Sequence, residues 1–129
     1  MAGHIDLFRK IIDRGFNGGD LSVADEICSP ALVEHQYLAG MNESGAAILK
    51  QQIQGARASV AGLTLSIEQY HETGDSIWVR MRATGTAQGH EVAFDVFDLC
   101  RFKDGKLVEH WGVPDRFAML HQAGLLPPR

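Results

Sequence analysis

The sequence predicts a single α+β domain over residues 1–129, with a curled antiparallel sheet wrapped around three N-terminal helices and a short C-terminal helix. Two patterns carry this prediction. Apolar residues recur at helical spacing in three stretches before residue 61, and they alternate with polar residues over long runs from residue 63 onward. Strands of about ten residues are long, and a meander of long strands twists and curls. Helices on the concave side of such a sheet make a cone whose open end forms a pocket.

The first helix is indicated by apolar residues at spacings of three and four, with charged residues between them. We expect the glycine-containing run 15–19 to end this helix. Its apolar residues are Ile5, Phe8, Ile12 and Phe16.

A second, short helix is predicted to begin at a cap formed by Asp20 or Ser22 and to stop near Pro30. Residues 31–38 form either a strand fragment or an extended entry segment. The third helix starts after Ser44-Gly45 and has apolar positions at Ile48, Ile53 and Val60.

The rest of the chain predicts β-structure, because apolar and polar residues alternate between turn signals. The expected strands are 63–72, 76–87, 90–102 and 107–112, with a bulge at Gly85. The turns that separate them are Gly74-Asp75, Gln88-Gly89 and Asp104-Gly105.

Composition excludes several classes of protein. The net charge is −4, and no run of basic residues is longer than two, so we expect no nucleic-acid partner. Cys28 and Cys100 are far apart in the sequence, which favours reduced thiols and a cytoplasmic location. The N-terminus lacks a signal-peptide pattern and no stretch is long and apolar enough to span a membrane, so a soluble protein is expected.

Three titratable residues near the end of the chain fall among apolar neighbours. Asp98 shares a strand face with Val96 and Cys100, and a carboxylate in such a setting is costly unless it is paired or functional. Its structural alternative is a salt bridge across the sheet, to Arg80 or Arg82.

His110 has the same strand-face parity as Val108, and its structural alternative is a hydrogen-bonded core histidine. Asp115 follows Pro114 at the position of a helix N-cap, and capping is compatible with proton transfer.

The motifs of several other chemistries are missing. The sequence has neither the histidine and cysteine spacings of metal sites nor the motifs of nucleophilic hydrolases and phosphate-binding loops. Acid–base chemistry on a small organic ligand remains. It needs a proton acceptor near a carbon acid and a donor for the oxyanion that develops.

The order of elements, with FNGGDL after the first helix and DGKLVEHWGVPD near the end, resembles the SnoaL-like polyketide cyclases, in the cone-shaped superfamily of ketosteroid isomerase and nuclear transport factor two. The resemblance covers nearly the whole chain. It implies ring closure by intramolecular aldol chemistry without a cofactor or metal, with Asp115 as the acid/base. It also implies a homodimer through the outer face of the sheet.

Ketosteroid isomerase gives a second, weaker resemblance. Its D-x-x-R-F segment is similar to Asp98–Phe102, which implies that Asp98 faces the pocket as the donor to the oxyanion. The segment that ends in its general base is similar to residues 31–35, which places His35 at the base position. The partner tyrosine of that site would fall near Ile12, where no tyrosine occurs, so this sequence departs from the steroid isomerases.

The expected function is therefore cofactor-independent acid–base catalysis on a small hydrophobic carbonyl compound, of the polyketide cyclase type. The expected catalytic residues are Asp115, His35, Asp98 and His110, and Phe16 and Trp78 are expected pocket walls. The alternatives are a non-catalytic binding protein with the same pocket, and an isomerase, dehydratase or epoxide hydrolase on the same scaffold.

Overall fold

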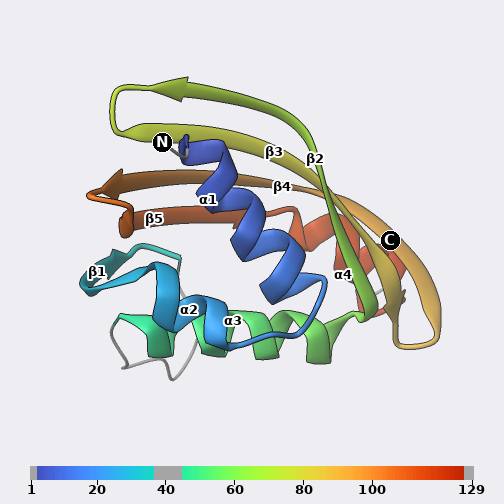
Figure 1. Cartoon of the computed structure of the whole chain (residues 1–129). Coiled ribbons are helices and arrows are strands. Elements are labelled where there is room, and N and C mark those ends of the chain that lie inside the picture. Colours follow the sequence, from blue (N-terminus) through green and yellow to red (C-terminus); the bar gives the residue numbers. More distant parts are fainter. Residues whose placement is uncertain (1–2, 37–44, 127–129) are drawn as a thin grey trace.

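The computed structural model describes residues 3–36 and 45–126. Within these ranges the chain forms an α+β fold in which helices cover the concave side of one open, curved sheet (Figure 1). The helices are α1 (His4–Lys10), the π-helix η1 (Ile11–Phe16), α2 (Ser22–Ile27), α3 (Ala46–Ser59) and α4 (Arg116–Gln122). The strands are β1 (Cys28–Glu34), β2 (Ala61–Thr73), β3 (Ser76–Ala87), β4 (His90–Lys103) and β5 (Lys106–Pro114).

The sheet has the strand order β1-β5-β4-β3-β2 and is mixed. The four predicted strands form the expected antiparallel meander, and β1 adds a fifth strand that pairs in parallel with β5. Residues 31–34 of the segment that the sequence left open therefore belong to β1, which starts at Cys28, and residues 37–38 of that segment lie outside the described residues. Helix α2 correspondingly ends at Ile27, earlier than the predicted stop near Pro30.

The core lies between the concave face of the sheet and the helices. Alternation along β3 buries Ile77, Val79 and Met81, as the pattern predicts. It leaves Trp78 exposed, contrary to the expectation that Trp78 is a pocket wall. Phe8 and Ile12 of the first helix pack into the same core. None of the described helices has the length and hydropathy needed to cross a membrane.

The first helical segment ends within the expected run 15–19, at Phe16, and its last part is the π-helix η1. The amide of Asn17 donates to the carbonyl of Ile12 at 2.8 Å, which is the i→i+5 bond of a π-helix. Gly15 is needed inside this turn because a Cβ there would lie 2.8 Å from Cδ1 of Ile53. The glycine serves close packing on α3 rather than termination.

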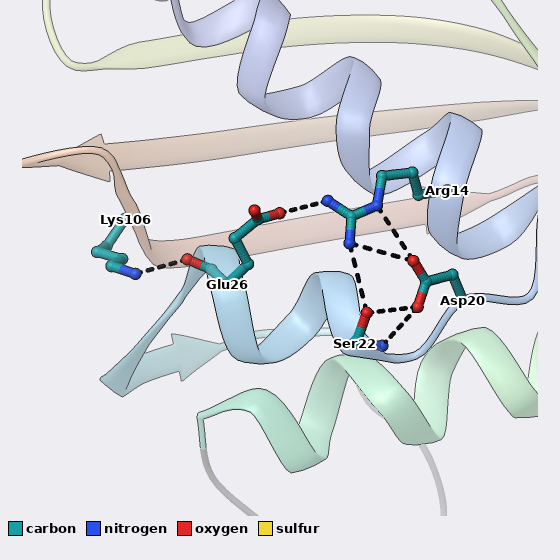
Figure 2. A network of polar contacts seen from close by, with 5 residues as sticks. All are labelled: Arg14, Asp20, Ser22, Glu26 and Lys106. Carbon is teal, nitrogen blue, oxygen red and sulfur yellow. Dashed lines mark hydrogen bonds and ion pairs between the residues drawn. The ribbon is translucent and has the colours of Figure 1, made fainter.

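An ion-pair network on the surface joins η1 to α2 and β5 (Figure 2). The Arg14 guanidinium donates to Oδ2 of Asp20 at 3.1 and 3.2 Å and pairs with the Glu26 carboxylate. Ser22, at the start of α2, donates to the Asp20 carboxylate, so Asp20 contacts both elements. Lys106 donates to the backbone carbonyl of Glu26. Because the charged groups are exposed, each pair adds little stability, and the network mainly sets how these elements meet.

The sequence predicts a bulge at Gly85 in β3, but the irregularity occurs in the neighbouring strand β2. The β3–β4 pairing is continuous through Gly85, whereas the β2–β3 register shifts between Ala61 and Thr64, opposite it. A Cβ on Gly85 would lie 2.5 Å from Cγ1 of Val60 and 2.7 Å from the Ala61 carbonyl oxygen. The glycine therefore allows the start of β2 to press against β3 where the sheet bends.

Candidate active site

A cavity of about 250 Å³ lies between the helices and the concave face of the sheet. Its walls are mostly apolar and come from the first helix with η1, from α3 and α4, and from all five strands. Examples are Phe8, Ile11, Leu49, Leu65, Met81 and Phe94. A few polar side chains also line it, and these are Glu34, Gln36, Gln52, Ser59, Asp98, His110 and Arg116. An apolar hollow with a small number of polar groups is typical of a site for a small organic ligand.

Three of these polar side chains form a chain of hydrogen bonds. Nδ1 of His110 lies 2.9 and 2.8 Å from the two carboxylate oxygens of Glu34, and its Nε2 lies 3.1 Å from Oδ1 of Asp98. The side chains of Glu34, Asp98 and His110 are only 3%, 10% and 12% exposed. One imidazole thus bridges two carboxylates inside an apolar cavity.

The two carboxylates determine the charge of the imidazole. Burial by itself lowers the pKa of His110, but the hydrogen bonds and charges of Asp98 and Glu34 outweigh burial and raise this pKa from 6.5 to about 10. His110 is therefore an imidazolium at neutral pH and donates from both ring nitrogens. Since neither nitrogen keeps a free lone pair, His110 in this state is unsuited to hold a metal ion. Residues 3–36 and 45–126 contain no group of three or more potential ligands arranged for a metal.

Strand register brings the three side chains together. Glu34 pairs with His110 in the parallel β1–β5 ladder, and Asp98 pairs with Gly112 in the antiparallel β4–β5 ladder. Val108 is the extra residue of a bulge in β5, because Glu109 pairs with Arg101 and Leu107 with Phe102. The bulge changes the alternation, so that both Leu107 and His110 face the cavity.

Gly112 makes room for the cluster. A Cβ at this position would lie 2.3 Å from Oε1 of Gln36, 2.8 Å from Oδ1 of Asp98 and 2.9 Å from Cε1 of His110. These distances are shorter than any normal contact, so the glycine is required by the side chains that converge above it.

Of the residues predicted for the site, Asp98, His110 and Phe16 line the cavity. Asp98 does not form the alternative salt bridge to Arg80 or Arg82. The outward-facing Asp95 pairs with Arg82 instead, at 3.2 Å. The Asp98 side chain therefore faces the cavity, on the same side of β4 as Val96 and Cys100, as expected.

Asp115 is exposed and is the N-cap of α4, where its Oδ1 accepts a hydrogen bond of 3.0 Å from the amide of Ala118. Its own side chain does not line the cavity, although Pro114 and Arg116 on either side do. The structure thus places Asp115 at the edge of the cavity and separates it from the Asp98–His110 pair.

His35 lies outside the cavity. Alternation along β1 sends Glu34 inward and His35 outward, where its ring stacks on Trp111 with centroids 4.4 Å apart and its Nε2 lies 2.8 Å from Oε2 of Glu109. The expected wall residue Trp78 is also outside, 52% exposed on the convex face of β3, because its neighbours Ile77 and Val79 take the inward positions.

Among the polar residues that line the cavity, the sequence interpretation missed Glu34, Gln36, Gln52, Ser59 and Arg116. Glu34 had a signal in the sequence, since it lies two residues from the buried Leu32 in a strand. Gln52 had one too, because it lies four residues after Ile48 on the apolar face of a helix. Nothing comparable marks Gln36, which lies two residues beyond the last residue of β1.

The fold has several solved relatives. A protein from Bacillus cereus ATCC 10987, described as a candidate polyketide cyclase, superposes with a TM-score of 0.84 at 24% identity, over 94% of this chain and 80% of its own. The candidate polyketide cyclase IdmH from Streptomyces antibioticus has a TM-score of 0.80 at 25% identity, over 93% and 97% of the two chains. AclR from Streptomyces galilaeus, described as a candidate hydroxylase, has a TM-score of 0.77 at 26% identity, over 95% and 96%.

A comparison with curated protein sequences found no match. The family model of the SnoaL-like polyketide cyclases matches residues 6–123, which include every element described above except the first residues of α1. Family membership, together with the candidate cyclases among the structural neighbours, supports a cyclase- or isomerase-type role. The chain belongs to the SnoaL-like polyketide cyclase family.

Proposed function

We propose that the protein is a cofactor-independent acid–base catalyst that closes a ring in a hydrophobic carbonyl compound by intramolecular aldol chemistry. The observation that carries this proposal is the Glu34–His110–Asp98 cluster inside the apolar cavity. Buried ionisable groups that share one site are expensive for a fold, and they concentrate where proton transfer is needed.

Asp98 is the proposed general base. Among the hydrogen bonds of the described residues, only its Oδ1 takes part, with His110, which leaves Oδ2 for a ligand in the cavity. The carboxylate removes a proton from the carbon next to a carbonyl, and the resulting enolate carbon attacks a second carbonyl of the same molecule. Asp98, now a carboxylic acid, returns the proton to the alkoxide that forms.

His110 and Glu34 support this base. The imidazolium fixes the orientation of Asp98, and the Glu34 carboxylate balances the imidazolium charge from its other side. Glu34 is itself held by the backbone amide of Gln36, which donates to its Oε1 at 2.8 Å. The base therefore reaches the ligand in a fixed position, which is a large part of what a protein contributes to proton transfer.

Asp115, which the family resemblance assigns as the acid/base, is the competing base. Asp115 lies at the edge of the cavity, and one of its oxygens is already engaged in capping α4. Substitution of each aspartate by asparagine separates the two assignments, because asparagine keeps the shape of the side chain and removes its basicity.

The test is deuterium exchange at the α-carbons of 2-tetralone, an apolar bicyclic ketone, in D₂O near neutral pH. We expect wild-type protein to exchange these protons faster than buffer, and Asp98→Asn to reduce the catalysed rate about a hundredfold. The matched control is Asp95→Asn, which removes a carboxylate from the same strand on its outer face and should leave the rate unchanged.

Two results would contradict this assignment. A loss of exchange in Asp115→Asn with full exchange in Asp98→Asn would move the base to Asp115. Binding of 2-tetralone by wild-type protein with no exchange above buffer would contradict catalysis and favour the non-catalytic binding protein.

A further inference from the structure

Gln52 is a buried polar residue on an otherwise apolar helix face. It lies on α3 with Ile48, Leu49 and Ile53, all of them buried, and it is only 7% exposed. The exposed face of the same helix carries other glutamines, such as Gln51. Gln52 thus occupies a position on the buried, apolar face of α3 at which an apolar residue is expected.

The amide nitrogen of Gln52 has no hydrogen-bond partner among the residues that the structure describes. Its Nε2 is fully buried, and the side chain lines the cavity. Buried amide nitrogens without a partner are rare in folded proteins, and each one calls for an explanation. Because the Gln52 side chain lines the cavity and its carboxamide rotates about the Cγ–Cδ bond, an acceptor on a molecule in the cavity would supply the missing partner.

The position of Gln52 places this donor on a different wall from the acid–base cluster. Asp98 and His110 come from strands β4 and β5, whereas Gln52 comes from α3. Most of the other side chains that line the cavity are apolar, for example Leu49, Leu65 and Val96. A ligand that satisfies both walls has an apolar body and an acceptor oxygen turned towards the helix.

We propose that Gln52 is the ligand-recognition residue of the cavity, where its Nε2 donates a hydrogen bond to a neutral carbonyl oxygen of the ligand. A carboxamide is an uncharged donor, so it selects a ketone or similar acceptor without requiring a charged ligand. This inference deepens the proposed function and rests on it only in taking the ligand to be a carbonyl compound.

The experiment compares three probes of nearly the same shape in an NMR titration: 2-tetralone, the corresponding alcohol 2-tetralol, and the hydrocarbon tetralin. We expect wild-type protein to bind the ketone about fivefold to tenfold more tightly than tetralin, the scale of one net hydrogen bond. In Gln52→Met this preference should fall to about one, with tetralin bound as tightly as before. Gln51→Met is the matched control on the exposed face of the same helix and should keep the preference.

Two further readouts separate recognition from a structural role. The side-chain amide signals of Gln52, identified by their loss in Gln52→Met, should shift with the ketone and stay in place with tetralin. Gln52→Met should also unfold at or above the wild-type temperature, because it removes an unpartnered polar group. An unchanged ketone preference, a stronger binding of the alcohol than of the ketone, or an equal loss of all three probes with a lowered unfolding temperature would each overturn the proposal.

The outcome is independent of catalysis. Asp98→Asn should lose deuterium exchange and keep its preference for the ketone over tetralin. Failure of the acid–base proposal would appear as absent exchange with the preference intact. Failure of the recognition proposal would appear as exchange without any preference that depends on Gln52.

Discussion

His110 shows at the scale of single residues how neighbours set the charge of a group. Its pKa rises from 6.5 to about 10, so the fold binds a proton that the unfolded chain releases near pH 6.5. The stability from this proton is fully present below pH 6.5 and is lost as the pH rises towards 10.

We therefore expect the free energy of unfolding to fall between pH 6.5 and about 8.5 in urea titrations, and His110→Gln to flatten this dependence. The measurement stays below about pH 8.5 because burial raises the pKa of the Cys28 thiol from 9.0 to about 12, which adds its own loss of stability at higher pH. His121→Gln, which changes an exposed histidine, is the control and should keep the pH dependence of the wild type. A slope that persists in His110→Gln would contradict the charged state assigned to the imidazole.

Gly112 tests whether the convergence of side chains matters for activity. Gly112→Ala places a methyl group within 3 Å of side-chain atoms of Gln36, Asp98 and His110, so these side chains must move. We expect a folded protein that is destabilised by about 1–3 kcal/mol and exchanges 2-tetralone protons at least about tenfold more slowly. Gly89→Ala is not a suitable control because of its positive φ. Gly3→Ala is suitable, since a Cβ there would make only ordinary contacts of 3.6 Å or more and Gly3 does not line the cavity. Full activity in Gly112→Ala would show that the cluster tolerates displacement.

At the scale of elements, Asp115 joins the end of β5 to the start of α4. Its backbone amide donates to the Asp95 carbonyl at 2.9 Å, while its side chain caps the helix. We expect Asp115→Ala to lower the free energy of unfolding by about 1 kcal/mol and Asp115→Asn to change it little, because asparagine also caps helices. Chemical denaturation of the two variants measures the difference. Equal losses in both variants would show that the negative charge, and not the cap, is what stabilises this end of the fold.

The elements also show where periodicity succeeds and where it stops. Alternation in β3 and β4 predicted which residues face inward, including Asp98, because these strands pair without interruption. Alternation fails in β5, where Leu107 and His110 differ by three positions and both face the cavity. The reason is the bulge at Val108, which depends on the pairing with β4 and has no glycine or proline to mark it.

At the scale of the whole molecule, the convex face of the sheet exposes large apolar side chains. Trp78, Phe97 and Val113 are 52%, 51% and 67% exposed, and Phe97 lies directly opposite Val113 in the β4–β5 ladder. The helices cover the concave side and leave this face open (Figure 1). An apolar patch that spans neighbouring strands marks an interaction surface.

We predict that a second copy of the chain covers this face, as the family resemblance implies. Light scattering during size-exclusion chromatography should give the mass of a dimer for the wild type and of a monomer for Phe97→Asp, because a dimer would bury the introduced charge. Phe117→Lys, which changes another exposed aromatic residue, on α4, should remain dimeric. A monomeric wild type, or a dimer in Phe97→Asp, would contradict the prediction.

The amino-acid sequence by itself determined the helices, the four antiparallel strands and the inward direction of Asp98, because these depend on periodicities that are local in the chain. Only the tertiary structure decided which polar groups meet. Glu34 reaches His110 through the parallel pairing of β1 with β5, 76 residues away along the chain, and Gln52 joins them in the cavity from α3. It also placed His35 outside the cavity, against Trp111 and Glu109, and left Asp115, whose capping position the sequence predicted, at the cavity's edge. The physical reason is that a site built by side chains from separate elements depends on strand register, a bulge and close approach at a glycine, which are settled only when the whole chain has packed.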